Sequence, residues 1–260
     1  MSTTGWIVLT AVMTGLSIYL FTKYNYYRSL VKQRGSFGRW PVKMASLPEL
    51  DPIFTADEFG PTLDTEVKFI GRGHLVVPGG TSDAEAWVLS VLARKAKRMF
   101  EFGTCTGKTA YLMAENSSPD AKVFTLTLPP AQIQTYNRDT QDSERATREA
   151  LSESTFAKFL YSGTSVENKI TQIFCDSKQF DEKPFENQMD LIFIDGSHAL
   201  SYVNSDSMKA FRMVSPGGLI LWHDYRGPFQ TLDVYKALNQ LSKEKKLRHI
   251  EGTSLVAYRN

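Results

Sequence analysis

The chain has 260 residues, of which 42% are hydrophobic and 22% are charged, and its 30 basic and 28 acidic side chains give a net charge of +2. This composition is typical of a folded globular domain, and it excludes a disordered chain, a collagen-like chain and a nucleic-acid binder that relies on bulk positive charge. The two cysteines, Cys105 and Cys175, are too few for a disulfide framework and are compatible with a reducing compartment.

An uncharged apolar run of seventeen residues occupies positions 6–22. As a helix it would span roughly 26 Å, close to the thickness of the hydrocarbon core of a bilayer. Tyrosines follow it, and residues 1–48 carry six basic and no acidic side chains. Aromatic residues and positive charge after the run predict a single-pass membrane anchor with the following domain in the cytoplasm.

Two other interpretations of this run compete with a membrane anchor. A cleaved signal peptide requires basic residues before the apolar run and a small-x-small site after it, and neither is present. The alternative that the run is a helix buried against the domain stays open, because the run contains Thr, Ser and Gly. We predict an anchor and basic neck at residues 1–34, a linker and lead-in at 35–80, and a folded domain at 81–260. Residues 49–260, behind the basic segment, carry a net charge of −4.

Short apolar runs alternate with helix-length segments through the domain. A helical pattern begins after Thr81-Ser82, and the apolar runs that we expect to be strands lie at 98–102, 122–126, 170–174, 189–194 and 219–222. This alternation predicts a doubly wound, mostly parallel α/β sheet with helices on both faces. Residues 247–250 and 254–258 predict an antiparallel pair at one edge. The polar segment between Pro129 and Leu160 predicts a solvated helix, to which we assign no chemistry.

A glycine-containing turn follows the 98–102 strand, with Gly103 and Gly107 separated by three residues. Such a turn lets a ligand approach the backbone at a helix start. Gly107-Lys108-Thr109 matches the end of a phosphate-binding loop, but the leading glycine of that motif would stand at Phe102, so the loop is one residue short. A nucleotide triphosphatase is therefore disfavoured.

Histidine and aspartate follow two of the predicted strands. Asp195 and His198 come after the 189–194 strand, and His223 and Asp224 come after the 219–222 strand. Because the carboxyl ends of neighbouring parallel strands meet at one crevice, we expect these four side chains to share a site. Carboxylate oxygens together with an imidazole suit a divalent cation such as Mg²⁺ or Mn²⁺.

The segments EFGTCTGKTA, LTLPP, CDSKQFD, DLIFIDGSHALSYVNSDSMKA and PGGLILWHDY together resemble class I S-adenosylmethionine (SAM)-dependent O-methyltransferases. The resemblance extends from about Thr81 to Tyr258 and is to the macrocin and rhamnosyl O-methyltransferase-like family, more distantly to catechol O-methyltransferase. It implies a seven-stranded sheet, SAM as cofactor and a metal-assisted acceptor site.

Carried over by position, the resemblance implies roles for individual residues. His198 falls at the place of the general base, and Asp195, His223 and Asp224 at the places of the metal ligands. Cofactor contacts are expected from Thr81, Ser82, Glu101, Gly103, Thr104, Gly107, Thr127, Asp176, Ser177 and Asp195. Thr127 departs from the family, which usually has an acidic residue there for the ribose hydroxyls. Loss of that charge-assisted hydrogen bond predicts a cofactor affinity about tenfold to a hundredfold lower.

The sequence thus predicts methyl transfer from SAM to a hydroxyl of a small molecule such as a sugar, since neighbouring hydroxyls can chelate the cation. The alternative is a catalytically inactive, membrane-tethered methyltransferase-like scaffold. We expect membrane contact through residues 6–22. We expect no nucleic-acid partner, because residues 49–260 are net acidic and lack a basic aromatic stripe. Homo-oligomer formation stays open.

Overall fold

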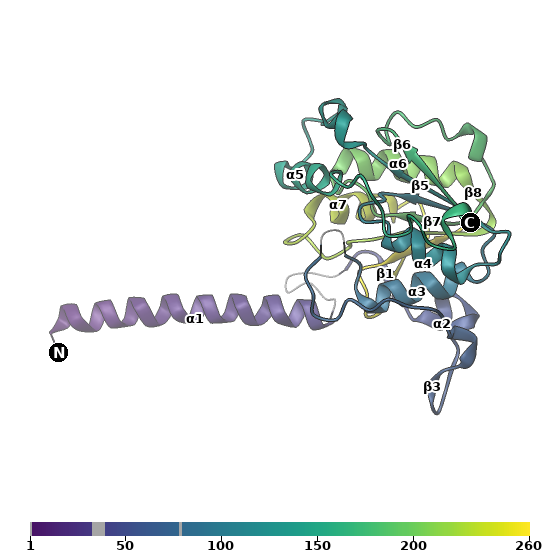
Figure 1. The fold of residues 1–260 in the computed structure, drawn as a ribbon. Helices are drawn as coiled ribbons and strands as arrows, with labels where there is room; N and C mark the ends of the chain where they lie inside the picture. Colours follow the sequence, from purple (N-terminus) through teal and green to yellow (C-terminus); the bar gives the residue numbers. More distant parts are fainter. Residues whose placement is uncertain (1, 33–39, 78–79) are drawn as a thin grey trace. The chain divides into compact units, whose positions relative to one another are not determined.

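The computed structural model describes the chain apart from residues 1, 33–39 and 78–79. Contacts between residues divide the chain into two compact units, Met1–Trp40 and Pro41–Asn260. Figure 1 shows the helix of the first unit in purple and the sheet and helices of the second unit in blue through yellow.

The first unit contains helix α1, Thr3–Lys32. Its stretch Thr3–Tyr26 has a mean hydropathy of 1.6 and is long and apolar enough to cross a membrane. The apolar side chains of this stretch are exposed, with Ile7 at 65% and Phe21 at 61%. The apolar helix expected at residues 6–22 is therefore present, although a signal sequence can have the same length and composition.

An eight-stranded sheet forms the centre of the second unit. Its order is β1-β9-β10-β8-β7-β4-β5-β6, and only β10 runs antiparallel to its neighbours. The strands are β1 (Lys43–Ala45), β4 (Arg98–Phe102), β5 (Lys122–Thr127), β6 (Ile170–Phe174), β7 (Met189–Ile194), β8 (Val214–Trp222), β9 (Arg248–Ile250) and β10 (Val256–Arg259). A separate hairpin pairs β2 (Ala56–Asp57) with β3 (Gly60–Pro61).

The predicted doubly wound, mostly parallel sheet is confirmed, with one strand more than the seven expected. The additional strand is β1, which comes from the predicted lead-in at 35–80 and pairs in parallel with β9. The expected antiparallel pair is β9 with β10. Because β1 covers β9, this pair does not form the edge of the sheet.

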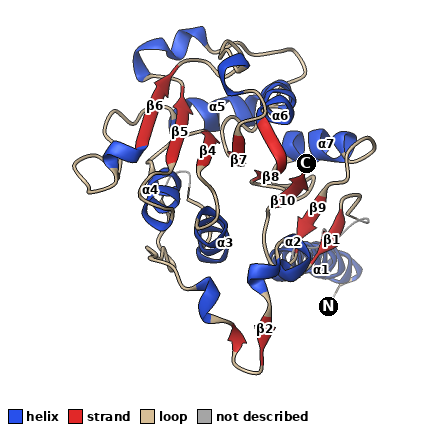
Figure 2. Ribbon diagram, turned by 90° about the vertical axis from the view of Figure 1, so that its right-hand side faces the viewer, coloured by secondary structure: helices blue, strands red, loops and turns tan. Residues whose placement is uncertain are grey.

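Helices cover both faces of the sheet. Figure 2 shows α3 and α4 on one face and α6 and α7 on the other. The α-helices of this unit are α2 (Leu47–Leu50), α3 (Asp83–Ala93), α4 (Lys108–Asn116), α5 (Glu144–Glu153), α6 (Leu200–Met213) and α7 (Leu232–Leu241). Short 3-10 helices lie at Pro52–Phe54, Leu63–Thr65, Pro130–Thr135, Glu167–Lys169 and Lys183–Phe185. The central strands are buried on both faces, which explains their continuous apolar sequence.

The carboxyl ends of three adjacent strands are aligned at one edge of the sheet. Phe102, the last residue of β4, is paired with Ile194 of β7, and Ile194 is paired with Trp222 of β8. The backbone of the next residues continues this register, since Asp195 N donates to Phe102 O and His223 N donates to Ile194 O. The residues that follow these strands are thus brought together.

Candidate active site

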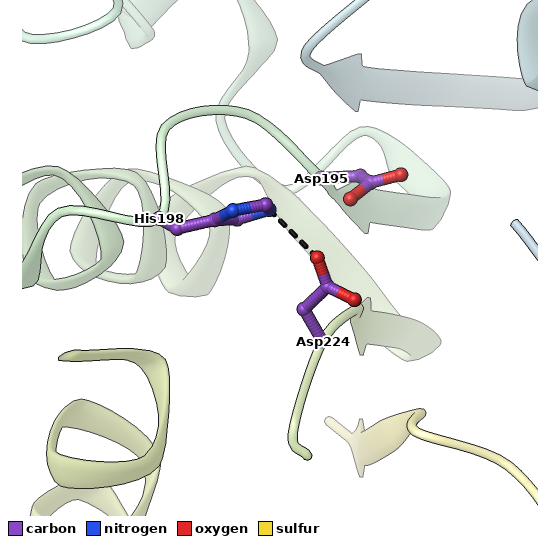
Figure 3. A group of neighbouring side chains, drawn as sticks. All are labelled: Asp195, His198 and Asp224. Atoms are coloured by element: carbon purple, nitrogen blue, oxygen red, sulfur yellow. Dashed lines mark ion pairs between the residues drawn. The ribbon is translucent and has the colours of Figure 1, made fainter. Parts of the chain in front are cut away.

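His198 and Asp224 form an ion pair at this edge of the sheet. The Nε2 atom of His198 lies 2.8 Å from Asp224 Oδ2, as Figure 3 shows, and its Nδ1 atom lies 3.7 Å from Glu149 Oε2. Although burial opposes protonation, the charge of Asp224 raises the pKa of His198 to about 10. His198 is therefore protonated at neutral pH in this arrangement. An imidazole in that state cannot accept a proton until the carboxylate charge beside it is offset.

His223 lies between carboxylates. Its Nδ1 is 2.9 Å from Asp195 Oδ1, and its Nε2 is 3.1 Å from Glu85 Oε2. Despite burial, the charges of Asp195, Asp224 and Glu85 raise the pKa of His223. Both ring nitrogens therefore have partners, and His223 is positioned to hold the carboxylates in place.

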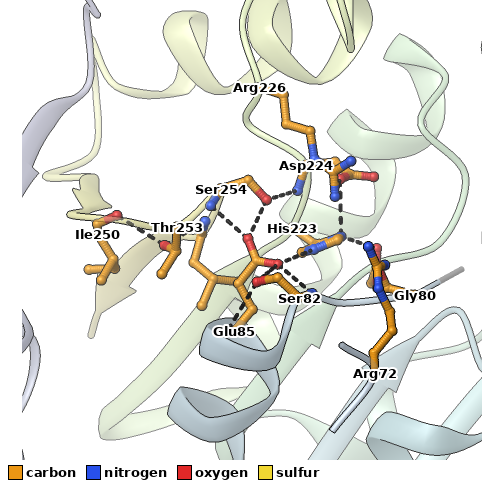
Figure 4. A network of polar contacts seen from close by, with 12 residues as sticks. Arg72, Gly80, Ser82, Glu85, His223, Asp224, Arg226, Ile250, Thr253 and Ser254 are labelled. Atoms are coloured by element: carbon orange, nitrogen blue, oxygen red, sulfur yellow. Dashed lines mark hydrogen bonds and ion pairs between the residues drawn. The ribbon is translucent and has the colours of Figure 1, made fainter. Parts of the chain in front are cut away.

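Glu85 fixes His223 from the side of α3. Figure 4 shows its carboxylate at the centre of a polar network with Ser82 and Ser254. Ser82 is the N-cap of α3, and Glu85 is the third residue of the same capping box. Against the effect of burial, the charge of His223 lowers the pKa of Glu85. The carboxylate of Glu85 therefore both caps α3 and holds His223 in the site.

The donor group that could hold a cation differs from the predicted set. Asp195, His198 and Asp224 each offer one ligand atom, and these atoms lie within 4.8 Å of one another. The imidazole of this group is that of His198, whereas the predicted ligand His223 has both nitrogens beside carboxylates. The carboxylate oxygens of Asp195 and Asp224 fit a divalent cation such as Mg²⁺ or Mn²⁺, which would then lie beside His198. The guanidinium of Arg226, 2.6 Å from Asp224 Oδ1, also neutralises this cluster.

Two cavities meet beside this cluster. Both are open to solvent, and the empty space in and at the mouth of each is about 530 Å³ for the first and about 1140 Å³ for the second. Four residues line both of them, namely Gly103, Cys105, Glu153 and Asp195. The His198–Asp224 pair lies in the wall of the second cavity. The two cavities therefore have part of their lining in common, and the second one includes the ion pair.

The predicted cofactor residues divide between these cavities. The first is lined by Gly103, Thr127, Asp176, Ser177 and Asp195, and the second by Thr81, Gly103, Thr104 and Asp195. Thr81 is 1% exposed, and its Oγ1 atom has no hydrogen-bond partner within the described part of the chain. A buried hydroxyl that faces a cavity without a partner indicates a place for a polar ligand group.

Three predicted cofactor residues, Ser82, Glu101 and Gly107, are not among those that line the two cavities. Ser82 caps α3, as described above. Gly107 is the N-cap of α4 at a φ of 77°, where a side chain would meet Phe159 and Tyr161. The structure therefore gives Ser82 and Gly107 roles in shaping the backbone rather than in lining the cavities.

Glu101 is completely buried inside the sheet. The hydroxyls of Thr109 and Thr125 donate hydrogen bonds to its carboxylate. Burial raises its pKa to about 8 against the effect of these hydrogen bonds. Glu101 therefore connects β4, β5 and α4 beneath the glycine turn, and its contact with a cofactor is not supported by its position.

The turn itself requires glycine at its first position. Gly103 has a φ of 101°, and a Cβ atom there would lie closer than 3.0 Å to the backbone of Asp195 and Gly196. Cys105, two residues later, also has a positive φ, of 43°. The close approach of the turn to the end of β7 brings the two cavities to a common wall.

Several residues of the site were not predicted from the sequence. Glu149 and Glu153 belong to α5, the helix expected to be solvated, yet both line the second cavity. Burial raises the pKa of Glu153 to about 7, against the effect of the His198 charge. Arg226 follows Asp224 by two residues and was left without a role. The sequence around Glu149 and Glu153 is predominantly polar, so it does not indicate that one face of α5 lines a cavity.

Comparison with known proteins agrees with this geometry. Residues 100–225 match the family described as a methyltransferase domain. No match was found among curated proteins. A methyltransferase of Podospora anserina with bound SAH is 18% identical, with 70% of this chain and 80% of that chain covered and a TM-score of 0.50. An O-methyltransferase of Streptomyces achromogenes involved in tomaymycin synthesis, in complex with SAM, is 14% identical over 70% and 82%, with a TM-score of 0.47.

The Podospora anserina structure supports the fold, a mostly parallel sheet with β10 antiparallel and helices on both faces. The narrower macrocin and rhamnosyl O-methyltransferase-like family stays a prediction from the sequence. Residues 100–225 thus match a methyltransferase-domain family, and the fold around them is similar to that of a solved methyltransferase.

Proposed function

We propose that the chain is a SAM-dependent O-methyltransferase that binds its cofactor in the first cavity and a hydroxyl-bearing acceptor in the second. The observation that carries this proposal is the common wall of the two cavities at Gly103 and Asp195, with the His198–Asp224 pair in the second. In-line displacement requires donor and acceptor to approach within contact distance. A shared wall meets this requirement.

The chain's residues suit SAM in two ways. The turn residue Gly103, which has no side chain, lines the first cavity. Asp176 and Ser177, which the sequence predicts beside the adenine, line the same cavity. SAM when bound supplies an activated methyl group, so the protein has to align the acceptor oxygen and remove its proton.

His198 is the proposed proton acceptor. It lines the second cavity, and its pairing with Asp224 and approach to Glu149 fix the direction of the ring. A positioned base of this kind contributes about 10² to 10⁴ in rate. Asp195 and Asp224 would hold a divalent cation, which when bound lowers the pKa of the acceptor hydroxyl. Neutralisation of Asp224 by a cation would also favour the neutral form of His198.

The proposed acceptor is a small molecule with neighbouring hydroxyls, such as a sugar. The second cavity supports this proposal, because its wall combines carboxylates with Lys108, Arg145 and Arg226. Side chains of both signs can orient a ligand rich in hydroxyl groups by hydrogen bonds.

We propose further that α1 anchors the chain in a membrane in a single pass, with the methyltransferase domain in the cytoplasm. The exposed apolar side chains of Thr3–Tyr26 and the basic residues that follow support this orientation. Fractionation and protease protection of the full chain in cells test it. Release by alkaline carbonate would argue against a spanning anchor.

Transfer of a labelled methyl group from SAM to a panel of sugars and catechols tests the proposed reaction. We expect at least one vicinal-hydroxyl acceptor to be labelled in a manner that depends on His198. Binding of SAM without transfer to any hydroxyl compound would contradict the O-methyltransferase assignment and favour a scaffold.

A further inference from the structure

Asp206 is a buried acidic residue of α6 that lines the first cavity. It is 1% exposed and shares the cavity wall with Asp176, Ser177 and Tyr202. Its Oδ1 atom has no hydrogen-bond partner among the residues that the structure describes. Because a buried carboxylate oxygen without a donor is costly, this atom indicates a place where a ligand donates a hydrogen bond.

The neighbouring Asp176 differs in this respect. Its Oδ1 accepts a hydrogen bond from Lys178 N, and its Oδ2 accepts one from the hydroxyl of Tyr202, both at 2.9 Å. Asp176 is thus held by the protein on both oxygens. Asp206 supplies an acceptor that the described residues leave open.

The surroundings of Asp206 make an unpaired charge unfavourable. Burial raises its pKa to about 7, against a hydrogen bond from Ser177 and the charge of Lys209. A donor from a ligand would offset this desolvation by pairing with Oδ1. The unpaired Oδ1 atom and the burial of Asp206 therefore both indicate a ligand that donates a hydrogen bond here.

The rest of this cavity suits a flat aromatic ring. Tyr136 and Tyr202 stack with ring centroids 4.5 Å apart, and both line the cavity together with Leu128 and Ala150. Apolar walls accept the faces of a heterocycle, and polar groups at one end read its edge. An amino group on the ring edge is the donor that an open carboxylate oxygen would select.

We propose that Asp206 is a specificity-determining residue, whose Oδ1 accepts a hydrogen bond from the exocyclic amino group of a bound adenine. This inference rests on the proposed function, since it takes the first cavity as the SAM site. A purine with a carbonyl oxygen in place of the amino group presents an acceptor to Asp206. Above the pKa of Asp206, where its carboxylate is ionised and cannot donate, the cavity therefore selects against this purine.

Calorimetric titration of the full chain at pH 8.5 with S-adenosylhomocysteine (SAH) and with S-inosylhomocysteine tests the proposal, because Asp206 is ionised at this pH. These ligands differ in the amino or carbonyl group on the purine ring. We expect the wild type to bind SAH at least about tenfold more tightly, because the carbonyl leaves the buried carboxylate unpaired. Asp206→Leu should bind SAH about tenfold more weakly and reduce the preference to about threefold or less.

Asp206→Asn provides a nearly isosteric second variant. Its amide can donate to the carbonyl of the inosine compound, so its preference for SAH should also fall by about tenfold. Asn204→Leu is the matched control, since Asn204 lies on the same helix and is not among the residues that line the first cavity. It should keep the wild-type preference. Circular dichroism and melting temperatures establish that each variant is folded.

The outcomes separate this inference from the proposed function. If the wild type binds SAH and both Asp206 variants fold and keep its preference, the role of Asp206 is overturned and the proposed function stands. If Asp206→Leu does not fold, Asp206→Asn alone tests the role of Asp206: a reduced preference for SAH supports this role, and an unchanged preference overturns it. If the wild type binds neither compound, the proposed function is wrong and the assignment of Asp206 falls with it.

Discussion

His198 and Asp224 meet across the ends of two strands, with Nε2 of the imidazole 2.8 Å from Oδ2 of the carboxylate. Asp224 adopts a φ of 63°, a backbone conformation that costs free energy in a residue other than glycine. Such strain persists where the surrounding structure holds it. Here it aims the carboxylate at His198.

Replacement of His198 by alanine should abolish most of the methyl transfer. We expect turnover to fall by about 10² to 10⁴, because His198 is the proposed base for the acceptor proton. SAH affinity should change by less than about threefold, since His198 lines the second cavity rather than the first. Initial rates and SAH titrations measure the two effects. His74→Ala, at an exposed histidine, is the control, and turnover near the wild-type level in His198→Ala would remove His198 from the mechanism.

Removal of divalent cations should suppress turnover. We expect EDTA to lower the rate at least about tenfold and added Mg²⁺ or Mn²⁺ to restore it, because the cation polarises the acceptor hydroxyl. Asp195→Ala should be inactive with or without added metal. EDTA already saturated with magnesium serves as the control. Full activity in EDTA would show that Asp195, His198 and Asp224 act without a cation.

Alanine at Gly103 should destabilise the domain and abolish SAH binding. Its Cβ atom would clash with the backbone of Asp195 and Gly196, so the strand ends must separate. Gly252→Ala is the matched control, since Gly252 has a similar positive φ of 78° with nothing within 4 Å of an added Cβ. The control should lose about 1 kcal/mol of stability from backbone strain alone. Denaturant unfolding and SAH titration compare them, and equal losses would contradict the close approach.

Glu101 should make the domain less stable as pH rises. Its pKa is about 8 in the folded protein and 4.5 in a model peptide, so the folded state keeps a proton that the unfolded chain loses in this window. Stability then falls with rising pH between these values, by up to about 1.4 kcal/mol per pH unit. Glu101→Gln should remove this loss and be more stable than the wild type at pH 8.

Denaturant unfolding at pH 5.5 and pH 8 measures the difference. Glu186→Gln, at an exposed glutamate, is the control and should follow the wild type at both values. An equal pH dependence in Glu101→Gln and wild type would mean that the carboxyl group of Glu101 is not protonated in the folded state.

The sequence was sufficient for the parts of the fold and site that depend on local pattern. Apolar runs of four to six residues predicted β4 to β8, and the polar residues directly after them were predicted to converge because parallel strands end at one edge. Strand β1, with three residues, has no detectable periodicity, and its pairing with β9 depends on tertiary contacts.

The orientation of individual side chains could not be predicted in the same way. His198 and His223 both follow strands, and spacing does not reveal which ring faces the open cavity and which is enclosed by carboxylates. Glu85 forms a hydrogen bond with His223, which is 138 positions away in the sequence. Its place in the capping box of α3 already accounts for a glutamate at this position, so the sequence does not indicate the contact with His223. Glu149 likewise has a local explanation as an ion-pair partner of Arg145, which hides its approach to His198.

Calorimetric titration of the purified full chain with SAM, with ATP as the comparison ligand, tests the central claim most directly. The account predicts a saturable heat with SAM that SAH competes away, and none with ATP. Absence of heat with SAM at millimolar concentration, for a protein that melts cooperatively, would contradict a cofactor site over the Gly103 turn.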